Sequence, residues 1–234
     1  MTMANRISVA VCTPTAGSVK ASYCLSMVGM IAHFLTTPVT EDPNEQRIAL
    51  YDLMIGSMIT NGRETMMRQV IESGSATHML FVDDDMGWEK DCLNLAVARD
   101  KDIVLANYRR KMYPWTFTAR MSDGNGGDRE CLTNDDKNFL EPVLFGGFGF
   151  CLMKVDKIKE IPQPRFDNQW IEIRKAFTTE DICFMDKARF YGLEVYVDHG
   201  ISKKVWHVGD FTYRYSDNPA VPAEPLPEVN RFKL

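Results

Sequence analysis

The sequence predicts an α/β protein whose central sheet is mostly parallel and is flanked by helices. Over the first 108 residues, apolar β-branched runs alternate with segments whose apolar residues recur at helical spacing. This alternation is typical of a parallel, doubly wound sheet. Hydrophobic residues make up 45% of the 234 residues and charged residues 25%. The chain therefore has the composition and the length for one substantial core.

Four strands and three helices are expected in this first part of the chain. Apolar runs predict strands at residues 6–13, 48–55, 78–83 and 102–108. Helical spacing predicts helices at residues 18–35, 63–73 and 89–99. The spaced apolar residues of the first helix are Leu25, Val28, Ile31, Ala32 and Leu35. Gly74 is expected to end the second helix, because glycine adopts the left-handed conformation of a helix cap without strain.

The second half of the chain is less regular. Polar, turn-rich segments predict loops at 122–130 and 133–139. A glycine-interrupted strand that runs into a short helix is expected at 142–158, and a helix with an acidic start at 179–192. A strand at 193–198 and an extended segment at 203–209 follow. We expect one domain over residues 1–216 and a proline-rich tail over 217–234.

Charge and composition exclude several classes of protein. The formal net charge of −5 gives no overall attraction to nucleic acid or anionic membranes, although it is compatible with a local basic patch. No segment approaches the roughly 20 apolar residues that span a bilayer, and the first residues are too polar for a secretory leader. Six scattered cysteines without a CxxC pair predict reduced thiols. We therefore expect a cytoplasmic protein that does not engage membranes.

Three adjacent aspartates, Asp83, Asp84 and Asp85, directly follow the apolar run at 78–82. In an open parallel sheet, ligands bind beyond the carboxyl ends of the strands. Adjacent carboxylates repel one another unless a cation compensates them, and oxygen ligands suit Mg²⁺ or Mn²⁺. The pattern is equally consistent with a solvated turn before Trp88. The triplet alone does not decide between a metal site and a turn.

Two further features favour a site. Glu180 and Asp181 stand at the first turn of a predicted helix, where they either compensate the helix dipole or provide a general base. His207 follows an apolar strand, and an imidazole is a suitable partner for an aspartate–metal site, especially with manganese. A lone histidine is more often structural, so each feature keeps a simpler interpretation.

Four motifs, in order along the chain, resemble those of GT-A-fold glycosyltransferases close to the family-2-like group. AVCTPTAG resembles the first strand and nucleotide-contacting loop, and LFVDDDM resembles the DXD motif. FGGFGFCLMKVDKI resembles the glycine-containing strand before the acceptor region. TEDICFMDKARFYGLEVYVDHGISKKVWHVG resembles the xED helix with the strand and the metal-binding histidine that follow it. The resemblance covers about residues 7–209. It implies a Rossmann-like sheet in one GT-A-like domain, with a nucleotide-sugar-binding half (1–110) and an acceptor and catalytic half (111–216).

The resemblance also implies roles for individual residues. Donor contacts are expected from Thr13, Pro14, Arg63, Asp83, Asp84 and Lys111. The metal, Mn²⁺ or Mg²⁺, is expected at Asp85 and His207, with Asp83 contacting it through water or contacting the ribose instead. Asp181 resembles the base of inverting members, and Glu180 is expected to orient the donor or acceptor. For Arg63, an exposed residue of the first helical turn is nearly as good an interpretation as the donor contact. His199 stands where relatives often have proline and is a rival metal ligand.

The implied activity is transfer of a sugar from a nucleotide-sugar donor, such as a UDP-sugar, to an acceptor hydroxyl. Small GT-A proteins of this kind resemble those of bacterial viruses, some of which glycosylate hydroxymethylated pyrimidines in DNA. Double-stranded DNA is therefore one expected acceptor, with phosphates bound by Arg109–Lys111 and by Lys203 and Lys204. If the protein is viral, it would act in the host cytoplasm. A cell-surface or polysaccharide sugar is the alternative acceptor.

Two other classes of protein compete with this interpretation. A nucleotidyltransferase also needs carboxylates and a metal, but CTPTAGSVKAS has one glycine and one lysine where such enzymes carry a glycine-rich basic loop. A non-catalytic nucleotide-sugar-binding module remains, and it would not need a carboxylate at Asp181. The sequence leaves open the sugar, the linkage and the oligomeric state.

Overall fold

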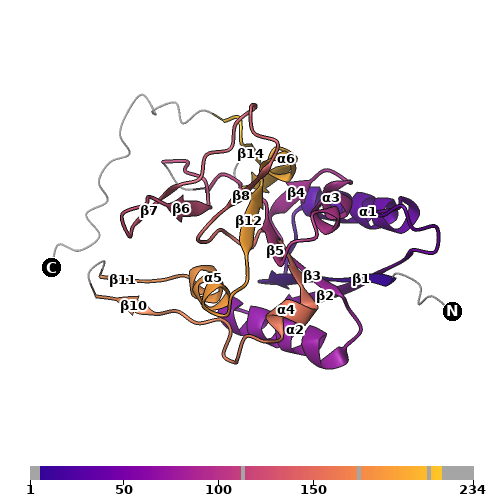
Figure 1. The fold of residues 1–234 in the computed structure, drawn as a ribbon, viewed down its shortest axis with the longest axis horizontal. Helices are drawn as coiled ribbons and strands as arrows, with labels where there is room; N and C mark the ends of the chain where they lie inside the picture. The colour runs from indigo at the N-terminus through magenta and orange to yellow at the C-terminus, as the bar shows by residue number, and fades with distance from the viewer. Residues whose placement is uncertain (1–5, 112–113, 173–174, 210–211, 218–234) are drawn as a thin grey trace.

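The computed structural model describes residues 6–111, 114–172, 175–209 and 212–217. At its centre lies a seven-stranded sheet (Figure 1). In spatial order the strands are β2 (Gln46–Ile55), β1 (Arg6–Thr15), β3 (His78–Val82), β9 (Phe150–Lys154), β5 (Ile103–Leu105), β12 (Val195–Asp198) and β8 (Leu140–Pro142). Strand β9 runs antiparallel to β3 and β5, and β8 runs antiparallel to β12, whereas the other neighbours are parallel. The sheet is therefore mixed and mostly parallel, which confirms the predicted fold class.

Helices cover both faces of this sheet (Figure 1). One layer consists of α1 (Ala21–Thr36), α3 (Cys92–Ala98) and α6 (His199–Ser202). The other consists of α2 (Ile59–Ser73), α4 (Val155–Ile158) and α5 (Glu180–Phe190). Because β1 alternates its side chains between the two faces, Val9 and Val11 pack in the first core and Ala10 and Cys12 in the second. Both faces are thus buried, as expected for a strand inside an α/β sheet.

Three smaller sheets extend the domain. Strands β4 (Met86–Trp88), β13 (Val205–Val208) and β14 (Thr212–Tyr213) form one of them, in the order β14-β13-β4. Two hairpins, β6–β7 (Arg120–Ser122 and Asp128–Glu130) and β10–β11 (Trp170–Ile171 and Ala176–Phe177), form the others. The sheet β14-β13-β4 positions a candidate site residue. It pairs His207 with Met86, the residue directly after the aspartate triplet.

All four strands and three helices predicted for the first part of the chain are present, with shifted bounds. Helix α2 begins at Ile59, before the predicted start, and Gly74 ends it with φ 60° and ψ 14° as expected. The second half differs more. The loop predicted at 122–130 is the hairpin β6–β7. Strands β4, β8, β10, β11 and β14 and helix α6 were not predicted. Such two- to four-residue elements are too short to show a hydrophobic period.

The first helix has the predicted location but buries a different face. Leu25 and Val28, two of the spaced apolar residues, are 77% and 71% exposed. Tyr23, Met30 and Phe34 are buried against the sheet instead. Two overlapping apolar stripes are present on this helix, and the stripe with the larger side chains packs inward, since it removes more apolar surface from water.

Three other expectations concern the chain as a whole. The six cysteines are all free thiols, as expected. In the described part of the chain, no helix has both the length and the apolar character that crossing a bilayer requires. The proline-rich tail, apart from Asp217, lies outside the described residues.

Candidate active site

The three aspartates form the turn between β3 and β4. The turn is closed by the Met86 amide, which donates to the Asp83 carbonyl at 3.2 Å. It is attached on both sides, because the Lys20 amide donates to the Asp84 carbonyl at 3.0 Å and the Val208 amide to the Asp85 carbonyl at 2.7 Å. The backbone of the triplet is therefore fixed by α1 and β13. This arrangement directs the three carboxylates to three different sets of partners.

Asp83 is bound by a buried arginine of α2. Arg63, 2% exposed, donates from Nη2 to Asp83 Oδ1 at 2.7 Å and from Nη1 to Glu180 Oε1 at 2.5 Å. The guanidinium lies over the Phe148 ring, 4.9 Å from its centroid. Burial alone would lower the pKa of Arg63, but the Asp83 and Glu180 charges outweigh burial and raise it. Arg63 thus holds β3 and the start of α5 together across the site.

This geometry corrects one expectation. Arg63 is not an exposed first-turn residue, because α2 begins at Ile59 and the side chain points into the protein. Asp83 forms no direct three-ligand cluster with Asp85 and His207 among the described residues, so its contact with a metal through water or with the ribose stays a prediction. The carboxylate of Asp83 is already compensated by the guanidinium.

Asp85 and His207 do meet. His207 Nε2 lies 3.3 Å from Asp85 Oδ1, and Nδ1 lies 3.1 Å from the Arg109 carbonyl. A carbonyl only accepts, so Nδ1 carries a proton. With a second proton on Nε2 the ring pairs with the Asp85 carboxylate, and without it the Nε2 lone pair is available to bind a cation. Asp85 Oδ1 is buried without a hydrogen bond, which is costly for a carboxylate oxygen. A divalent cation fits this pair, because it would bind the imidazole nitrogen and satisfy the orphaned oxygen.

Lys111 makes the second contact of Asp85, as an ion pair with Oδ2. Burial alone would raise the pKa of Asp85, but His207 and Lys111 outweigh burial and hold it below its usual value. Lys111 therefore compensates the charge of Asp85 at the oxygen that does not face His207. For Asp84, burial and the charges of Asp85 and Asp83 raise the pKa, while a polar contact with the Thr15 side chain opposes the rise.

The glycines of FGGFGF make room for a tyrosine that supports His207. A Cβ at Gly149 would lie 2.6 Å from the Tyr108 ring, and one at Gly147 would also collide with that side chain. The Tyr108 hydroxyl accepts a hydrogen bond from the Gly149 amide at 2.9 Å. The ring of Tyr108 then stands edge-on to His207 at 5.3 Å. Sequence reasoning missed Tyr108, although the three closely spaced glycines indicated a close approach by another side chain.

Glu180 and Asp181 begin α5 but have different surroundings. Glu180 is 8% exposed; burial raises its pKa, and the Arg63 charge opposes the rise. Asp181 is half-buried, accepts from the Ile182 amide at 2.8 Å and lines a cleft of about 1180 Å³. The cleft lies between α5 and the hairpins β6–β7 and β10–β11. Of these two carboxylates, only Asp181 lines this cleft.

The remaining cleft wall combines aromatic, polar and charged groups. The lining includes Arg110, Phe117, Arg120, Asp123, Asp128, Phe145, Phe177, Thr178, Asp181 and Asp186. Arg120 is paired with Asp128 at 2.6 Å. Carboxylates therefore outnumber guanidinium groups on this wall. The cleft suits a hydroxyl-rich ligand that packs against rings better than it suits a polyanion.

Thr13 and Pro14, expected at the donor, are both buried in β1. The Thr13 hydroxyl is 2.5 Å from the Tyr23 hydroxyl. The Thr13 side chain is therefore hydrogen-bonded to α1 inside the protein. Thr15 is the residue of this strand end that reaches the aspartates, through its contact with Asp84. Among the residues of this strand end, Thr15 therefore has the side chain closest to the role expected of Thr13 and Pro14, whose donor contacts stay a prediction.

The comparisons with known proteins concern the fold. No protein-family model and no curated protein matches the sequence. The viral protein A197 from STIV matches the structure with a TM-score of 0.53 and 16% identity, covering 91% of this chain and 95% of A197. The glycosyltransferase GalNAc-T7, solved with UDP, GalNAc and Mn²⁺, gives a TM-score of 0.53 and 9% identity over 94% of this chain. The chain covers 46% of GalNAc-T7, so it spans about half that protein's length.

At these identities the likeness establishes the fold alone. The chain has a GT-A-like α/β fold, as the ordered motifs implied. A resemblance to glycosyltransferases is thus present at the level of architecture.

Proposed function

We propose that this protein is a nucleotide-sugar-dependent glycosyltransferase that uses a divalent cation. The observation that carries the proposal is the meeting of Asp85 Oδ1 and His207 Nε2 at 3.3 Å, beside a triplet at the carboxyl end of β3. Ligands of open α/β sheets bind at such ends. The likeness to GalNAc-T7, whose structure contains UDP, GalNAc and Mn²⁺, supports the same assignment.

In this proposal the two halves of one domain, 1–110 and 111–216, contribute different parts. Asp85 and His207 would hold Mn²⁺ or Mg²⁺, and Lys111 would turn from Asp85 to the donor phosphates. The bound cation would supply Lewis-acid stabilisation of the departing nucleoside diphosphate. Thr13 and Pro14 are proposed to contact the donor through the backbone only, since both side chains are buried.

Asp181 is the proposed general base. The acceptor oxygen would attack the anomeric carbon as the bond from that carbon to the diphosphate oxygen breaks. Asp181 would take the proton that the acceptor hydroxyl loses. Its place on the cleft wall, at the first turn of α5, supports this role. Attack from the side opposite the diphosphate would invert the anomeric centre.

Arg63 and its two carboxylates are proposed to act by positioning. The guanidinium fixes Asp83 on β3 and Glu180 on α5 at once. Because Asp181 follows Glu180 in the chain, this ion-pair network sets where the base stands relative to the triplet. In the proposal, Asp83 contacts the ribose rather than the cation.

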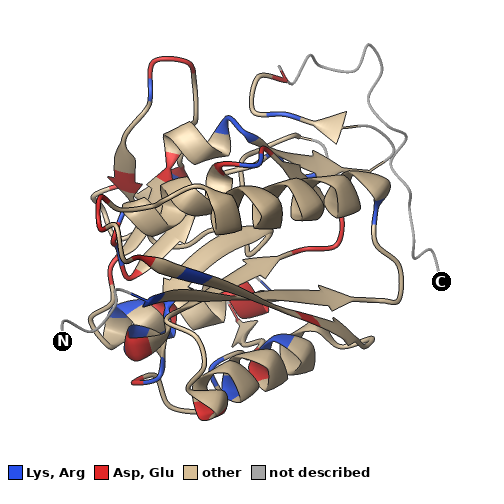
Figure 2. Ribbon diagram, turned by 90° about the vertical axis from the view of Figure 1, so that its right-hand side faces the viewer, with Lys and Arg blue, Asp and Glu red and all other residues tan. Residues whose placement is uncertain are grey.

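A glycan is the acceptor class that we propose. The cations expected to bind DNA phosphates are mostly used within the protein: Lys111 pairs with Asp85, Lys203 donates to the Asp135 carbonyl, and Lys204 pairs with Asp91. Arg109 lies over Phe117. On the face shown in Figure 2, basic segments are interleaved with acidic ones. A hydroxymethylated pyrimidine in DNA is less well supported, since phosphate binding requires free cations.

The testing experiment is donor binding followed by transfer. Thermal unfolding would be measured with nucleoside diphosphates and sugar nucleotides, each with Mn²⁺ or with a chelator, because a ligand of the folded state raises the melting temperature. We expect stabilisation by one sugar nucleotide that the chelator removes. No stabilisation by any donor would contradict the proposal.

Asp181→Asn then separates an enzyme from a binding module. Loss of the base should lower kcat by about 10²- to 10⁴-fold while donor affinity stays unchanged. Asp186→Asn, on the same helix and the same cleft wall, is the matched control and should retain transfer. Full activity in Asp181→Asn would exclude it as the base.

A further inference from the structure

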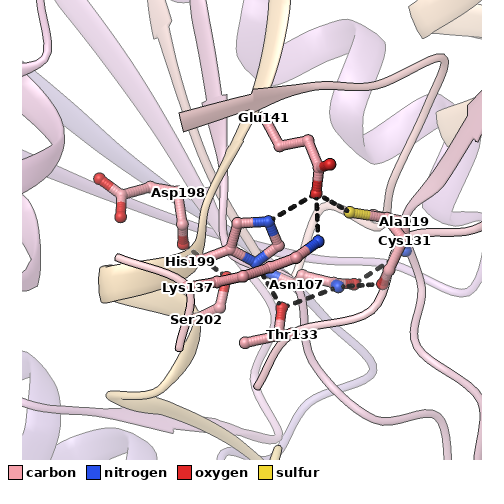
Figure 3. Close-up of polar contacts among 9 residues, drawn as sticks. All are labelled: Asn107, Ala119, Cys131, Thr133, Lys137, Glu141, Asp198, His199 and Ser202. Atoms are coloured by element: carbon pink, nitrogen blue, oxygen red, sulfur yellow. Dashed lines mark hydrogen bonds and ion pairs between the residues drawn. The ribbon is translucent and has the colours of Figure 1, made fainter. Parts of the chain in front are cut away.

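Figure 3 shows a second cluster of potential metal ligands, formed by residues other than those of the proposed active site. Cys131 Sγ, a Glu141 carboxylate oxygen and a His199 ring nitrogen all lie within 4.8 Å of one another. Among the described residues this is the only group of three such atoms. Cys131 and His199 are fully buried, whereas the Glu141 side chain is 18% exposed. Two of the three ligands are therefore buried, and the cluster reaches solvent at Glu141.

Two of the three separations between ligand atoms are close to those of a tetrahedral zinc site, and the third, from Cys131 to His199, is within 4.8 Å. Zinc with sulfur at about 2.3 Å and oxygen at about 2.0 Å separates these two ligand atoms by about 3.5 Å. Cys131 Sγ lies 3.5 Å from Glu141 Oε2. His199 Nε2 lies 2.8 Å from the same oxygen, against about 3.3 Å in a tetrahedral site. A shift of the Glu141 carboxylate by about half an ångström would satisfy both separations.

The histidine is held in place by a second set of polar groups. His199 Nδ1 lies 2.9 Å from Thr133 Oγ1, which in turn accepts from Asn107 Nδ2 at 3.1 Å. Without a cation, His199 Nε2 donates to Glu141 Oε2. When a cation binds, Nδ1 donates a hydrogen bond to Thr133 instead, and the Nε2 lone pair points to the cation. Metal-binding histidines are oriented by a partner on the other ring nitrogen in the same way.

A positive group already occupies the open side of the cluster. Lys137 Nζ lies 2.6 Å from Glu141 Oε2, the oxygen that faces both the thiol and the imidazole (Figure 3). Three donors around one carboxylate oxygen exceed the usual demand of its lone pairs. The lysine side chain is partly exposed, so it is able to swing into solvent and leave its place to a cation.

We propose that Cys131, Glu141 and His199 bind a zinc-class divalent cation that fastens the edge of the central sheet. A thiolate, an imidazole and a carboxylate form a ligand set typical of zinc rather than of Mn²⁺ or Mg²⁺. On binding, the thiol releases its proton and the cation replaces Lys137 at the carboxylate. A water molecule completes the fourth position.

The location indicates a structural role. Glu141 belongs to β8, a three-residue edge strand, and His199 follows β12, to which β8 pairs. Cys131 stands directly after β7 of the cleft hairpin. A cation at these three residues would tie β8, β12 and the hairpin together. This inference does not rest on the proposed glycosyltransferase activity.

The test is spectroscopic and uses the full chain with Co²⁺ as the probe. A cobalt–thiolate bond gives a near-ultraviolet charge-transfer band, which the sulfur-free Asp85–His207 pair cannot give. We expect one equivalent of Co²⁺ to produce this band and Zn²⁺ to remove it. Absence of the band in the wild-type protein would overturn the proposal.

Variants assign the band to the cluster. Cys131→Ser should abolish it, and the matched control Cys24→Ser, which alters an exposed thiol, should leave it unchanged. A band that survives in Cys131→Ser, or disappears in Cys24→Ser, would exclude this site. Circular dichroism of each variant would establish that it is folded.

Lys137→Gln provides an independent readout if Cys131→Ser fails to fold. Removing the competing ammonium should tighten Zn²⁺ binding by about tenfold or more, the scale on which groups around metal ligands act. Lys203→Gln, a nearby partly exposed lysine outside the cluster, should leave the affinity unchanged. Equal or weaker Zn²⁺ binding in Lys137→Gln would show that the cluster is a hydrogen-bonded network only.

Discussion

Arg63 of α2 and Asp83 at the end of β3 form an ion pair of 2.7 Å, and the same guanidinium binds Glu180 of α5. Three segments that are far apart in the sequence therefore meet at one buried side chain. The arrangement explains how a carboxylate beside an apolar strand is tolerated, since a buried charge needs a partner. It also holds Glu180, the residue before Asp181, on the same guanidinium as Asp83.

The first prediction concerns the stability that this network contributes. Arg63→Met leaves Asp83 and Glu180 without their shared cation, and we expect a loss of about 3–5 kcal/mol in the free energy of unfolding. Arg63→Lys keeps the charge but cannot bridge two carboxylates with a planar fork, so its loss should be smaller. Urea unfolding followed by circular dichroism measures both.

Arg68→Ala is the control for the same helix. Its ion pair with Glu72 is exposed, with side-chain exposures of 42% and 61%, and such pairs contribute at most about 1 kcal/mol. If Arg63→Met cost no more than Arg68→Ala, the buried network would not be a structural element of the site.

The second prediction concerns the cation at Asp85 and His207. Asp85→Asn and His207→Gln each remove one proposed ligand while nearly preserving shape. We expect either change to abolish the Mn²⁺-dependent part of donor binding and to leave the chelator-insensitive part. Calorimetry with and without Mn²⁺ measures the two parts.

Glu72, the carboxylate of the exposed ion pair with Arg68, offers a control for nonspecific metal binding. Glu72→Gln on α2 should change neither part, because it lies on a solvent-exposed helix face. Unchanged Mn²⁺ dependence in both Asp85→Asn and His207→Gln would remove the metal site from the proposed mechanism.

The sequence predicted the fold class, the elements of the first half and one contact of the candidate site. Long apolar strands such as β1 and the turn after β3 follow from local patterns, because burial on both faces requires continuous apolar runs. The meeting of Asp85 with His207 followed from the resemblance, across 122 positions that no periodicity connects. Local pattern therefore predicted the elements, and motif order predicted this one contact.

Other features depend on tertiary packing that the sequence does not display. The burial of Arg63 follows from its position between Phe148 and two carboxylates on other elements. Leu25 on α1 is exposed for the same reason. Helix α1 has two apolar stripes, and the surface it packs against decides which of them is buried. The role of Tyr108 depends on the space that Gly147 and Gly149 leave.

The third prediction concerns the packing between β4 and β13. Gly87 is buried and pairs with Trp206, and a Cβ there would collide with the indole and with Ser22. Gly87→Ala should therefore displace Trp206, cost about 1–3 kcal/mol of stability and shift the neighbouring His207. Thermal unfolding and Mn²⁺-dependent donor binding should both decrease.

Gly56→Ala is the matched control, because a Cβ at that glycine has no neighbour within 4 Å. It should leave stability and Mn²⁺-dependent binding close to the wild-type values. Wild-type behaviour of Gly87→Ala would mean that the small sheet tolerates a displaced Trp206 without moving His207.

The last prediction concerns pH and His78, at the start of β3. Burial, aided by the Lys154 charge, lowers the pKa of His78 from 6.5 to about 4. Between these values the unfolded chain binds a proton that the folded protein does not, so stability falls as the pH falls. The stability that depends on a neutral His78 is present above the unfolded-state pKa of 6.5. It should decrease by about 2 kcal/mol between pH 7 and pH 5. Urea unfolding at the two pH values measures the decrease, and His78→Gln should remove this part of it while leaving the contributions of other groups. An equal decrease in His78→Gln and wild type would show that His78 titrates alike in the folded and unfolded states.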